Sequence, residues 1–307
     1  MRAAEISELG RPPQPTEREG DGAIEVLAVA LNPLDLAVGA GRFYGGHPPL
    51  PYVPGCEAVG RVDGGRVYLF GEGFGTRRDG FLAERVDFPR ASAVPVPDGL
   101  DDAVAAACGI AGLAGWVPVA RTARVQPGDR VLVLGATGLV GSVALQGARL
   151  LGAERVVAAG RDPARLEGTR ALGADEIVQL DAGGDLVARF REACGGEGPT
   201  VVIDPLWGEP LRAAVEAAVP GARIVNIGQS AGPEATLTSA AIRGKQLTIR
   251  GYSDFALSAE ELREAYTELT GHVAAGRVTV RAETFPLDEV ASAWSAQASG
   301  RKAVVLF

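Results

Sequence analysis

VLVLGATGLVG, residues Val131–Gly141, is the stretch of sequence that decides the fold. The apolar run 131–134 predicts a buried strand, and the apolar residues from Leu139 onward predict a helix. A glycine-rich turn between a strand and a helix lets the backbone approach a pyrophosphate, and the helix N-terminus offers free N–H groups and partial positive charge. The stretch therefore predicts a dinucleotide site with contacts from Thr137, Gly138, Leu139 and Val140, although Ala136 replaces the first glycine of the usual G-x-G-x-x-G pattern.

Strands and helices are expected to alternate from this stretch onward. Strands are expected at 131–134, 155–159, 176–179, 201–204, 222–227 and 247–252, and helices at 139–151, 163–172, 184–193 and 210–218. This rhythm predicts a doubly wound parallel sheet with helices on both faces. The uncharged segment 131–148 approaches the length of a membrane span, but its four glycines and its polar residues fit a buried strand, turn and helix.

The end of the second expected strand bears on the choice of dinucleotide. NAD-binding domains place an acid on the ribose 2′-hydroxyl about 20 residues after the glycine loop. Here Gly160 is followed by Arg161, and Arg165 lies four residues later. Asp162 precedes Pro163 and fits a helix N-cap. Cations at this place suit a 2′-phosphate and favour NADP(H) over NAD, with a solvated loop charge as the alternative for Arg161.

The parts outside the alternating region are predicted to be rich in short strands. Strands are expected at 23–31, 57–62, 66–70, 81–86 and 93–96, with a proline-rich loop after residue 33 and an alanine-rich helical stretch at 101–120. The tail is expected to contain helices at 259–275 and 287–295 and strands at 278–283 and 303–307. These tail elements could pack back on the N-terminal part.

Composition limits the class of protein. A length of 307 residues fits two domains, and a net charge of −8 lacks the basic footprint of a nucleic-acid binder. Three cysteines are not a disulfide framework and favour a reducing, cytoplasmic setting. The first ten residues lack the apolar core of a signal peptide. No membrane partner is expected.

Six segments in order resemble those of one family. The chain is similar to the medium-chain dehydrogenase/reductase superfamily, and specifically to its zinc-independent quinone oxidoreductase branch. The segments are Asn32–Tyr44 with N-P-L-D and G-R-F-Y, Pro54–Gly60, Asp79–Glu84, Ala111–Trp116, Gln126–Val131 and Gly300–Leu306.

The resemblance implies an α/β architecture of two domains. A GroES-like, β-rich catalytic domain would comprise 1–115 and 256–307, and a Rossmann NADP-binding domain would comprise 116–255. The cofactor would lie between the domains, and the chain would form a homodimer through its Rossmann sheets. Gly228, Gln229 and Ser230 follow a Rossmann strand, where such loops meet the nicotinamide half. Lys302 is expected either to reach a cofactor phosphate or to be exposed.

Zinc is not expected, because catalytic zinc requires three protein ligands. The first ligand position of the zinc-dependent relatives falls at 32–35 without a cysteine, the second on Cys56 and the third on Ile110. Cys108 is offset by two residues from the third position, and the four-cysteine structural lobe is absent between Gly60 and Gly80. Cys56 is interpreted as a small buried residue, with a reactive thiol as the alternative.

An enzyme without zinc suits acceptors whose negative charge is delocalised, such as quinones and enones. Hydrogen-bond donors aimed at the acceptor oxygen would suffice, and the candidates are Asn32, Tyr44 and Tyr52. Packing or capping roles are the alternative for both tyrosines. The leading hypothesis is an NADPH-dependent quinone or enone reductase acting on a small carbonyl substrate. A pathway-specific enoyl or ketone reductase and a noncatalytic NADPH-binding sensor are the alternatives.

Overall fold

The computed structural model describes all residues from 1 to 307, and they form two compact units. The first unit comprises Met1–Ala111, Leu257–Gly276 and Val280–Phe307, and the second comprises Gly112–Ala256 and Arg277–Thr279. Segment 277–279 was expected in the catalytic domain. It belongs to the second unit, where Gln146 Nε2 donates to the carbonyl of Thr279 at 2.9 Å and Gln146 Oε1 accepts from the Thr279 N–H at 2.7 Å.

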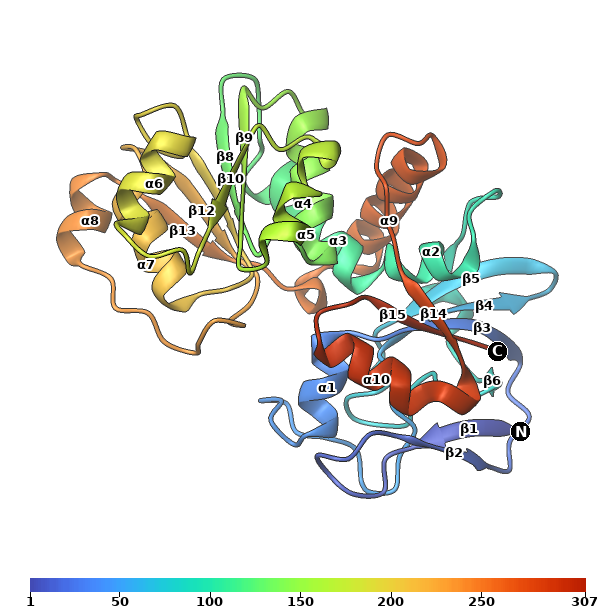
Figure 1. Cartoon of the computed structure of the whole chain (residues 1–307). Coiled ribbons are helices and arrows are strands. Elements are labelled where there is room, and N and C mark those ends of the chain that lie inside the picture. The colour runs from blue at the N-terminus through green and yellow to red at the C-terminus, as the bar shows by residue number, and fades with distance from the viewer. The chain divides into compact units, whose positions relative to one another are not determined.

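The second unit is built on a six-stranded parallel sheet (Figure 1), in the strand order β10-β9-β8-β11-β12-β13. This is the Rossmann order, in which the chain starts in the middle and is wound outward in both directions. The sequence-based expectation of a doubly wound sheet is confirmed. The strands are β8 (Arg130–Leu134), β9 (Arg155–Gly160), β10 (Glu176–Gln179), β11 (Val201–Asp204), β12 (Arg223–Asn226) and β13 (Thr248–Gly251).

Helices cover both faces of this sheet, because successive side chains of each buried strand point to opposite faces. Val131 and Val133 of β8 pack with α4 (Leu139–Leu150) and α5 (Pro163–Glu167). Leu132 and Leu134 pack on the opposite face with helices α6 (Leu186–Ala193) and α7 (Gly208–Ala217). The short helix α8 (Ser239–Gly244) lies against α7, as Figure 1 shows.

Two helices of this unit are shorter than expected. The helix expected at 163–172 ends at Glu167 and is followed by a separate 3₁₀ turn, Arg170–Leu172. The helix expected at 184–193 begins at Leu186, because Gly184 has a φ of +76° and Asp185 caps the first turn.

The first unit contains a seven-stranded sheet that joins the two ends of the chain (Figure 1). Its main order is β14-β15-β3-β4-β5-β7, with β6 paired to β3. Strand β15 runs antiparallel to β3, with Val305 opposite Val29, so the tail completes a sheet begun by the N-terminal segment. The strands are β3 (Ile24–Ala30), β4 (Glu57–Val62), β5 (Gly65–Phe70), β6 (Arg85–Val86), β7 (Val94–Pro95), β14 (Glu283–Pro286) and β15 (Ala303–Leu306).

Helices and a small hairpin surround this sheet. Helix α1 packs on α10, where a Cβ added to Gly39 would meet the ring of Trp294 at 2.8 Å. The first unit also contains the two-stranded sheet β1 (Arg2–Glu5) and β2 (Gln14–Glu17). The helices of this unit are α1 (Pro33–Gly39), α2 (Asp102–Ala107), α9 (Ala259–Ala274) and α10 (Val290–Ala298). Helix α3 (Ile110–Val117) lies mostly in the second unit and runs on into a π-helical turn at Pro118–Thr122.

Three expectations for the first unit were wrong. The strand expected at 81–86 is reduced to β6, because the N–H groups of Phe81 and Leu82 donate to the carbonyls of Gly55 and Pro54 in a loop. The proline-rich segment contains helix α1, for which Pro33 is a favourable first residue. The strand expected at 278–283 lies later, at Glu283–Pro286.

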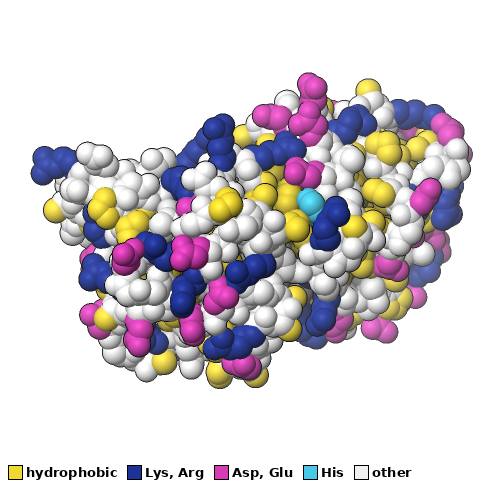
Figure 2. All heavy atoms as spheres, turned by 90° about the horizontal axis from the view of Figure 1, so that it is seen from above, with side chains coloured by type: hydrophobic (Ala, Val, Ile, Leu, Met, Phe, Trp, Pro, Cys, Tyr) yellow, Lys and Arg dark blue, Asp and Glu magenta, His cyan; other side chains and the backbone are white.

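The surface fits the mixed composition. On the face drawn in Figure 2, acidic and basic side chains are interspersed among polar and apolar ones. Every helix falls short of the length and apolar character needed to cross a membrane. The uncharged segment 131–148 forms β8, a turn and most of α4, as expected.

Candidate functional site

The glycine loop of the second unit brings helix α4 very close to strand β8. Gly135 has a φ of +62°, in the left-handed region that favours glycine. A Cβ on Gly141 would lie 2.5 Å from both the Ala136 Cα and the Gly135 carbonyl oxygen, so glycine is required there. Gly138 is the N-cap and no side chain caps the helix. The first N–H groups of α4 therefore offer the anion-binding terminus that a dinucleotide pyrophosphate needs.

The end of β9 lies beside this loop. Arg165 Nη2 donates to the carbonyl of Thr137 at 2.9 Å, which holds a guanidinium at the loop. Asp162 accepts from the N–H groups of Ala164 and Arg165, so it is a helix cap, as its position before proline indicated. Arg161 is exposed at the end of the strand. Two arginines, Arg161 and Arg165, therefore follow β9 closely, and the guanidinium of Arg165 lies at the glycine loop.

The loop after β12 is tied to the loop after β11. The Ser230 hydroxyl donates to the carbonyl of Pro205 at 3.2 Å. A Cβ on Gly228 would lie 2.8 Å from the same oxygen, so the two loops are in close contact. Gly228, Gln229 and Ser230 thus lie at the carboxyl edge of the sheet, where parallel α/β sheets bind their ligands.

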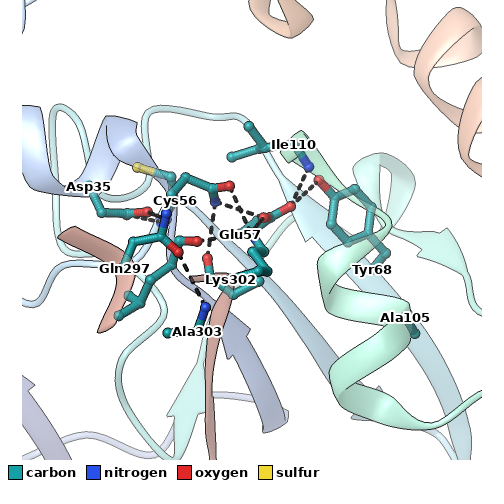
Figure 3. Close-up of polar contacts among 12 residues, drawn as sticks. Asp35, Cys56, Glu57, Tyr68, Ala105, Ile110, Gln297, Lys302 and Ala303 are labelled. Atoms are coloured by element: carbon teal, nitrogen blue, oxygen red, sulfur yellow. Dashed lines mark hydrogen bonds and ion pairs between the residues drawn. The ribbon is translucent and has the colours of Figure 1, made fainter. Parts of the chain in front are cut away.

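A buried polar cluster in the first unit surrounds Glu57, the first residue of β4 (Figure 3). Glu57 Oε1 accepts from Asn32 Nδ2 at 2.7 Å. Glu57 Oε2 accepts from the Tyr68 hydroxyl at 2.9 Å and from the Ile110 N–H at 2.6 Å. The Tyr68 ring stacks on Tyr266 with a centroid distance of 4.4 Å, which fixes its hydroxyl.

Lys302 belongs to this cluster, which corrects both positions expected for it. Its Nζ donates to the carbonyl of Leu31 at 2.8 Å and to Asn32 Oδ1 at 2.8 Å, and it lies 3.4 Å from Glu57 Oε1. Burial lowers the pKa of Lys302, although the nearby carboxylates act in the opposite direction. The ammonium has three acceptors within the first unit and is not exposed.

Asn32 and Asp35 organise the turn into α1. Asn32 Nδ2 donates to the carbonyl of Ala30 at 3.1 Å as well as to Glu57, so both amide hydrogens are engaged. Asn32 therefore positions Glu57 and Lys302, and its expected role as a donor to a substrate oxygen does not fit this geometry. Asp35 accepts from the N–H groups of Asn32 at 2.7 Å and Cys56 at 2.9 Å, and burial raises its pKa to about 6.

The two candidate tyrosines are in contrasting surroundings. Tyr52 is 1% exposed, and its buried hydroxyl has no hydrogen-bond partner in the protein. Burial raises the pKa of Tyr52, and the charges of Asp35 and Cys56 raise it further, so the hydroxyl keeps its proton. Tyr44 is 90% exposed and packs on Phe43 with a ring-centroid distance of 4.5 Å.

The cysteines are free and buried. Burial raises the pKa of the Cys56 thiol, and Asp35 raises it further, which fits a small packed residue better than a reactive thiolate. No group of three or more His, Cys, Asp or Glu side chains is arranged to hold a metal ion. Sequence reasoning missed Glu57, the ion-pair partner of Lys302, and Tyr68, which donates to Glu57. A glutamate at the start of an apolar strand was the only local signal.

The chain is similar to known dehydrogenases and reductases. A family described as "Zinc-binding dehydrogenase" matches residues 140–270. The chain is 32% identical to a component of the phenolphthiocerol/phthiocerol polyketide synthase of Mycobacterium tuberculosis over 95% of its own length, but it spans 13% of that relative. It is 28% identical to the quinone oxidoreductase of Lama guanicoe, over 95% of this chain and 92% of that protein.

Solved structures share the whole fold. An NAD-dependent alcohol dehydrogenase is 28% identical with a TM-score of 0.88, and each chain is fully covered. The quinone oxidoreductase of Thermus thermophilus, solved also in complex with NADPH, is 28% identical with a TM-score of 0.83 and full coverage of both chains. The fold is that of the dehydrogenases and reductases among these solved structures. The chain belongs to the medium-chain dehydrogenase/reductase superfamily, in its quinone oxidoreductase-like branch.

Proposed function

We propose that the protein reduces a quinone or an α,β-unsaturated carbonyl compound with NADPH and without zinc. The observation that carries the proposal is the hydrogen-bonded cluster at the positions where zinc-dependent relatives bind the metal. Asn32, Asp35 and Cys56 bond to one another or to Glu57, and Ile110 contributes a backbone N–H. The buried ammonium of Lys302 binds Asn32 Oδ1 and pairs with Glu57 Oε1, so the carboxylate of Glu57 already has a cationic partner without a metal.

NADPH, when bound, supplies the hydride. The protein must then stabilise negative charge on the acceptor oxygen, for which a preorganised hydrogen-bond donor suffices. Tyr52 is one candidate donor: its buried hydroxyl keeps its proton and has no partner in the protein, so an acceptor that reached it could take its hydrogen bond. Tyr44 is the second candidate, on an exposed loop.

The preference for NADPH rests on Arg161 and Arg165 at the end of β9. Arg165 is held on the glycine loop through Thr137, and Arg161 precedes the α5 cap. A guanidinium binds phosphate through charge-assisted hydrogen bonds. Gly160 and the backbone of Thr137–Val140 are proposed to complete the adenosine and pyrophosphate site, and Gly228, Gln229 and Ser230 the nicotinamide side.

A second candidate function is the reduction of an enoyl or ketone group in a biosynthetic pathway. The 32% identity with a polyketide synthase component favours it, because the chain matches 13% of the length of a much longer synthase subunit. The same residues would serve both reactions, so the two candidate functions differ only in the acceptor that the protein reduces.

We also propose that the protein is a cytoplasmic homodimer. Strand β13 forms one edge of the six-stranded sheet and its side chains are mostly exposed, so a second copy could pair with it. Three buried free thiols are consistent with a reducing compartment.

The test mixes the purified protein with NADPH or NADH and follows loss of nicotinamide absorbance with quinones, enones and enoyl or keto thioesters. The expected result is faster oxidation of NADPH than of NADH, unaffected by a chelator. Turnover with thioesters alone would support the second candidate. Saturable NADPH binding without turnover would favour a sensor, and inhibition by the chelator would contradict the zinc-free mechanism.

A further inference from the structure

Trp207, which precedes helix α7, has a strained backbone. Its φ is +59° and its ψ is −158°, a combination that is essentially restricted to glycine. Gly208 follows with a φ of +61°. A tryptophan adopts such a conformation only where its surroundings impose it.

The contacts that hold Trp207 in this conformation come from Asp204, the last residue of β11. Its Oδ1 accepts from the N–H groups of Leu206 at 2.9 Å and Trp207 at 2.8 Å, and the side chain is buried. Its Oδ2 accepts from Asn226 Nδ2 at 3.0 Å. Both oxygens of the buried carboxylate thus accept hydrogen bonds. These bonds hold the 204–207 turn, and with it the strained backbone conformation of Trp207.

Asn226 extends this hold to the neighbouring loop. Its Nδ2 lies 2.8 Å from the carbonyl of Gly228, while the Ala231 N–H donates to the carbonyl of Leu206 at 2.8 Å. A Cβ on Gly135 would meet the Leu206 side chain at 3.1 Å. The loops after β8, β11 and β12 therefore form one connected edge, and backbone strain concentrates at functional sites of this kind.

We infer that Asp204 and Asn226 are positioning residues that hold the strained Trp207 turn and the loop 228–230 in the arrangement that receives the nicotinamide half of the cofactor. The inference rests on the proposed cofactor. The second half of a doubly wound sheet, here β11 to β13, receives the second nucleotide of a dinucleotide. Loss of either residue is then expected to affect the nicotinamide half and to spare the adenosine half.

The experiment measures calorimetric dissociation constants for NADPH and for adenosine 2′,5′-bisphosphate, a probe of the adenosine half alone. In Asp204→Asn the side-chain amide would face the Asn226 amide, donor against donor. NADPH affinity is expected to fall about tenfold and the probe affinity by less than about threefold, as for the loss of one or two charge-assisted hydrogen bonds. Asn226→Ala, a milder change, is expected to act in the same direction.

A second part of the experiment tests the backbone strain of Trp207 by replacing this residue with glycine. Glycine adopts the Trp207 conformation without penalty, so Trp207→Gly introduced into Asp204→Asn is expected to restore most of the NADPH affinity. Asp101→Asn is the matched control, because Asp101 caps α2 through two N–H groups in the first unit. It is expected to leave both dissociation constants unchanged.

The outcomes separate the two proposals. Equal losses for NADPH and the probe, or no rescue by glycine, would overturn the positioning role. Unmodified protein that binds the probe and NADPH with equal affinity would likewise overturn it. If the unmodified protein binds neither, the proposed cofactor itself is wrong, and this inference falls with it.

Discussion

Glu57 and Lys302 form a buried ion pair, with Lys302 Nζ 3.4 Å from Glu57 Oε1 and side chains that are 4% and 0% exposed for the lysine and the glutamate. Taking two charges out of water is costly, and the pair persists because Asn32, Tyr68, Ile110 and Leu31 satisfy the remaining donors and acceptors.

Glu57→Gln is expected to lower the free energy of unfolding by about 3–5 kcal/mol, because it leaves a buried ammonium uncompensated. Urea denaturation followed by circular dichroism measures the change. Glu283→Gln is the control, since Glu283 pairs with Arg301 at the surface at 2.7 Å and its loss should cost about 0–1 kcal/mol. Equal effects of the two substitutions would contradict the buried character of the Glu57 pair.

Asp35 is expected to make the protein less stable as the pH rises from about 4 to 6. Burial raises the pKa of Asp35 in the folded protein to about 6, above its ordinary value of 3.8. The folded state then binds more protons than the unfolded state between these values, so stability falls with pH. The stability of wild type relative to Asp35→Asn should decline by up to about 3 kcal/mol between pH 4 and pH 7. Denaturation series at both pH values measure it, and a difference that is independent of pH would disprove the shift.

Gly141→Ala and Gly138→Ala are expected to separate packing from cofactor binding. A methyl group at 141 would overlap the backbone of Ala136 and Gly135, whereas one at 138 would lie 3.7 Å from the nearest atom, the Gly135 carbonyl oxygen. Gly141→Ala should therefore lower the melting temperature, with a cost of about 1–3 kcal/mol. Gly138→Ala should keep the melting temperature and weaken NADPH binding. A stable Gly141→Ala variant would show that α4 does not need the close approach.

Arg161→Ala is expected to lower the ratio of kcat/KM for NADPH to that for NADH by roughly tenfold to a hundredfold, the value of a charge-assisted bond to phosphate. Arg170→Ala is the control in the same unit, because its partners are Glu167 and Glu176 and the carbonyl of Asp175. Steady-state kinetics with NADPH and with NADH measures this ratio for each variant. An unchanged ratio would make Arg161 a solvated surface charge.

Tyr52→Phe is expected to reduce turnover by roughly a hundredfold to a thousandfold, as for the loss of an oxyanion donor, with stability preserved. The hydroxyl of Tyr52 makes no hydrogen bond that folding would lose. Tyr68→Phe should show the opposite pattern, because the Tyr68 hydroxyl donates to Glu57 and its loss should cost about 1.5–3 kcal/mol of stability. Full turnover by Tyr52→Phe would contradict the role of Tyr52 as the donor and leave Tyr44 as the candidate.

The sequence predicted the second unit well because its signals are local. Buried parallel strands appear as apolar runs, and the helix start at Leu139 follows its glycine loop directly. Strand β2, Gln14–Glu17, is polar and exposed, so no pattern marked it. The pairing of Glu57 with Lys302 joins residues 245 positions apart through β4, β3 and β15, and no local spacing encodes it.

The pairing of β15 with β3 also governs how the chain is made. A ribosome releases β3 long before Ala303–Leu306, so during synthesis the early sheet carries an unpaired strand edge and lacks the lysine that balances Glu57. Residues 112–256, in contrast, emerge as one uninterrupted stretch that holds all six strands of its sheet. The second unit can thus fold during synthesis before the first unit does, because the sheet of the first unit is completed only when Ala303–Leu306 has been made.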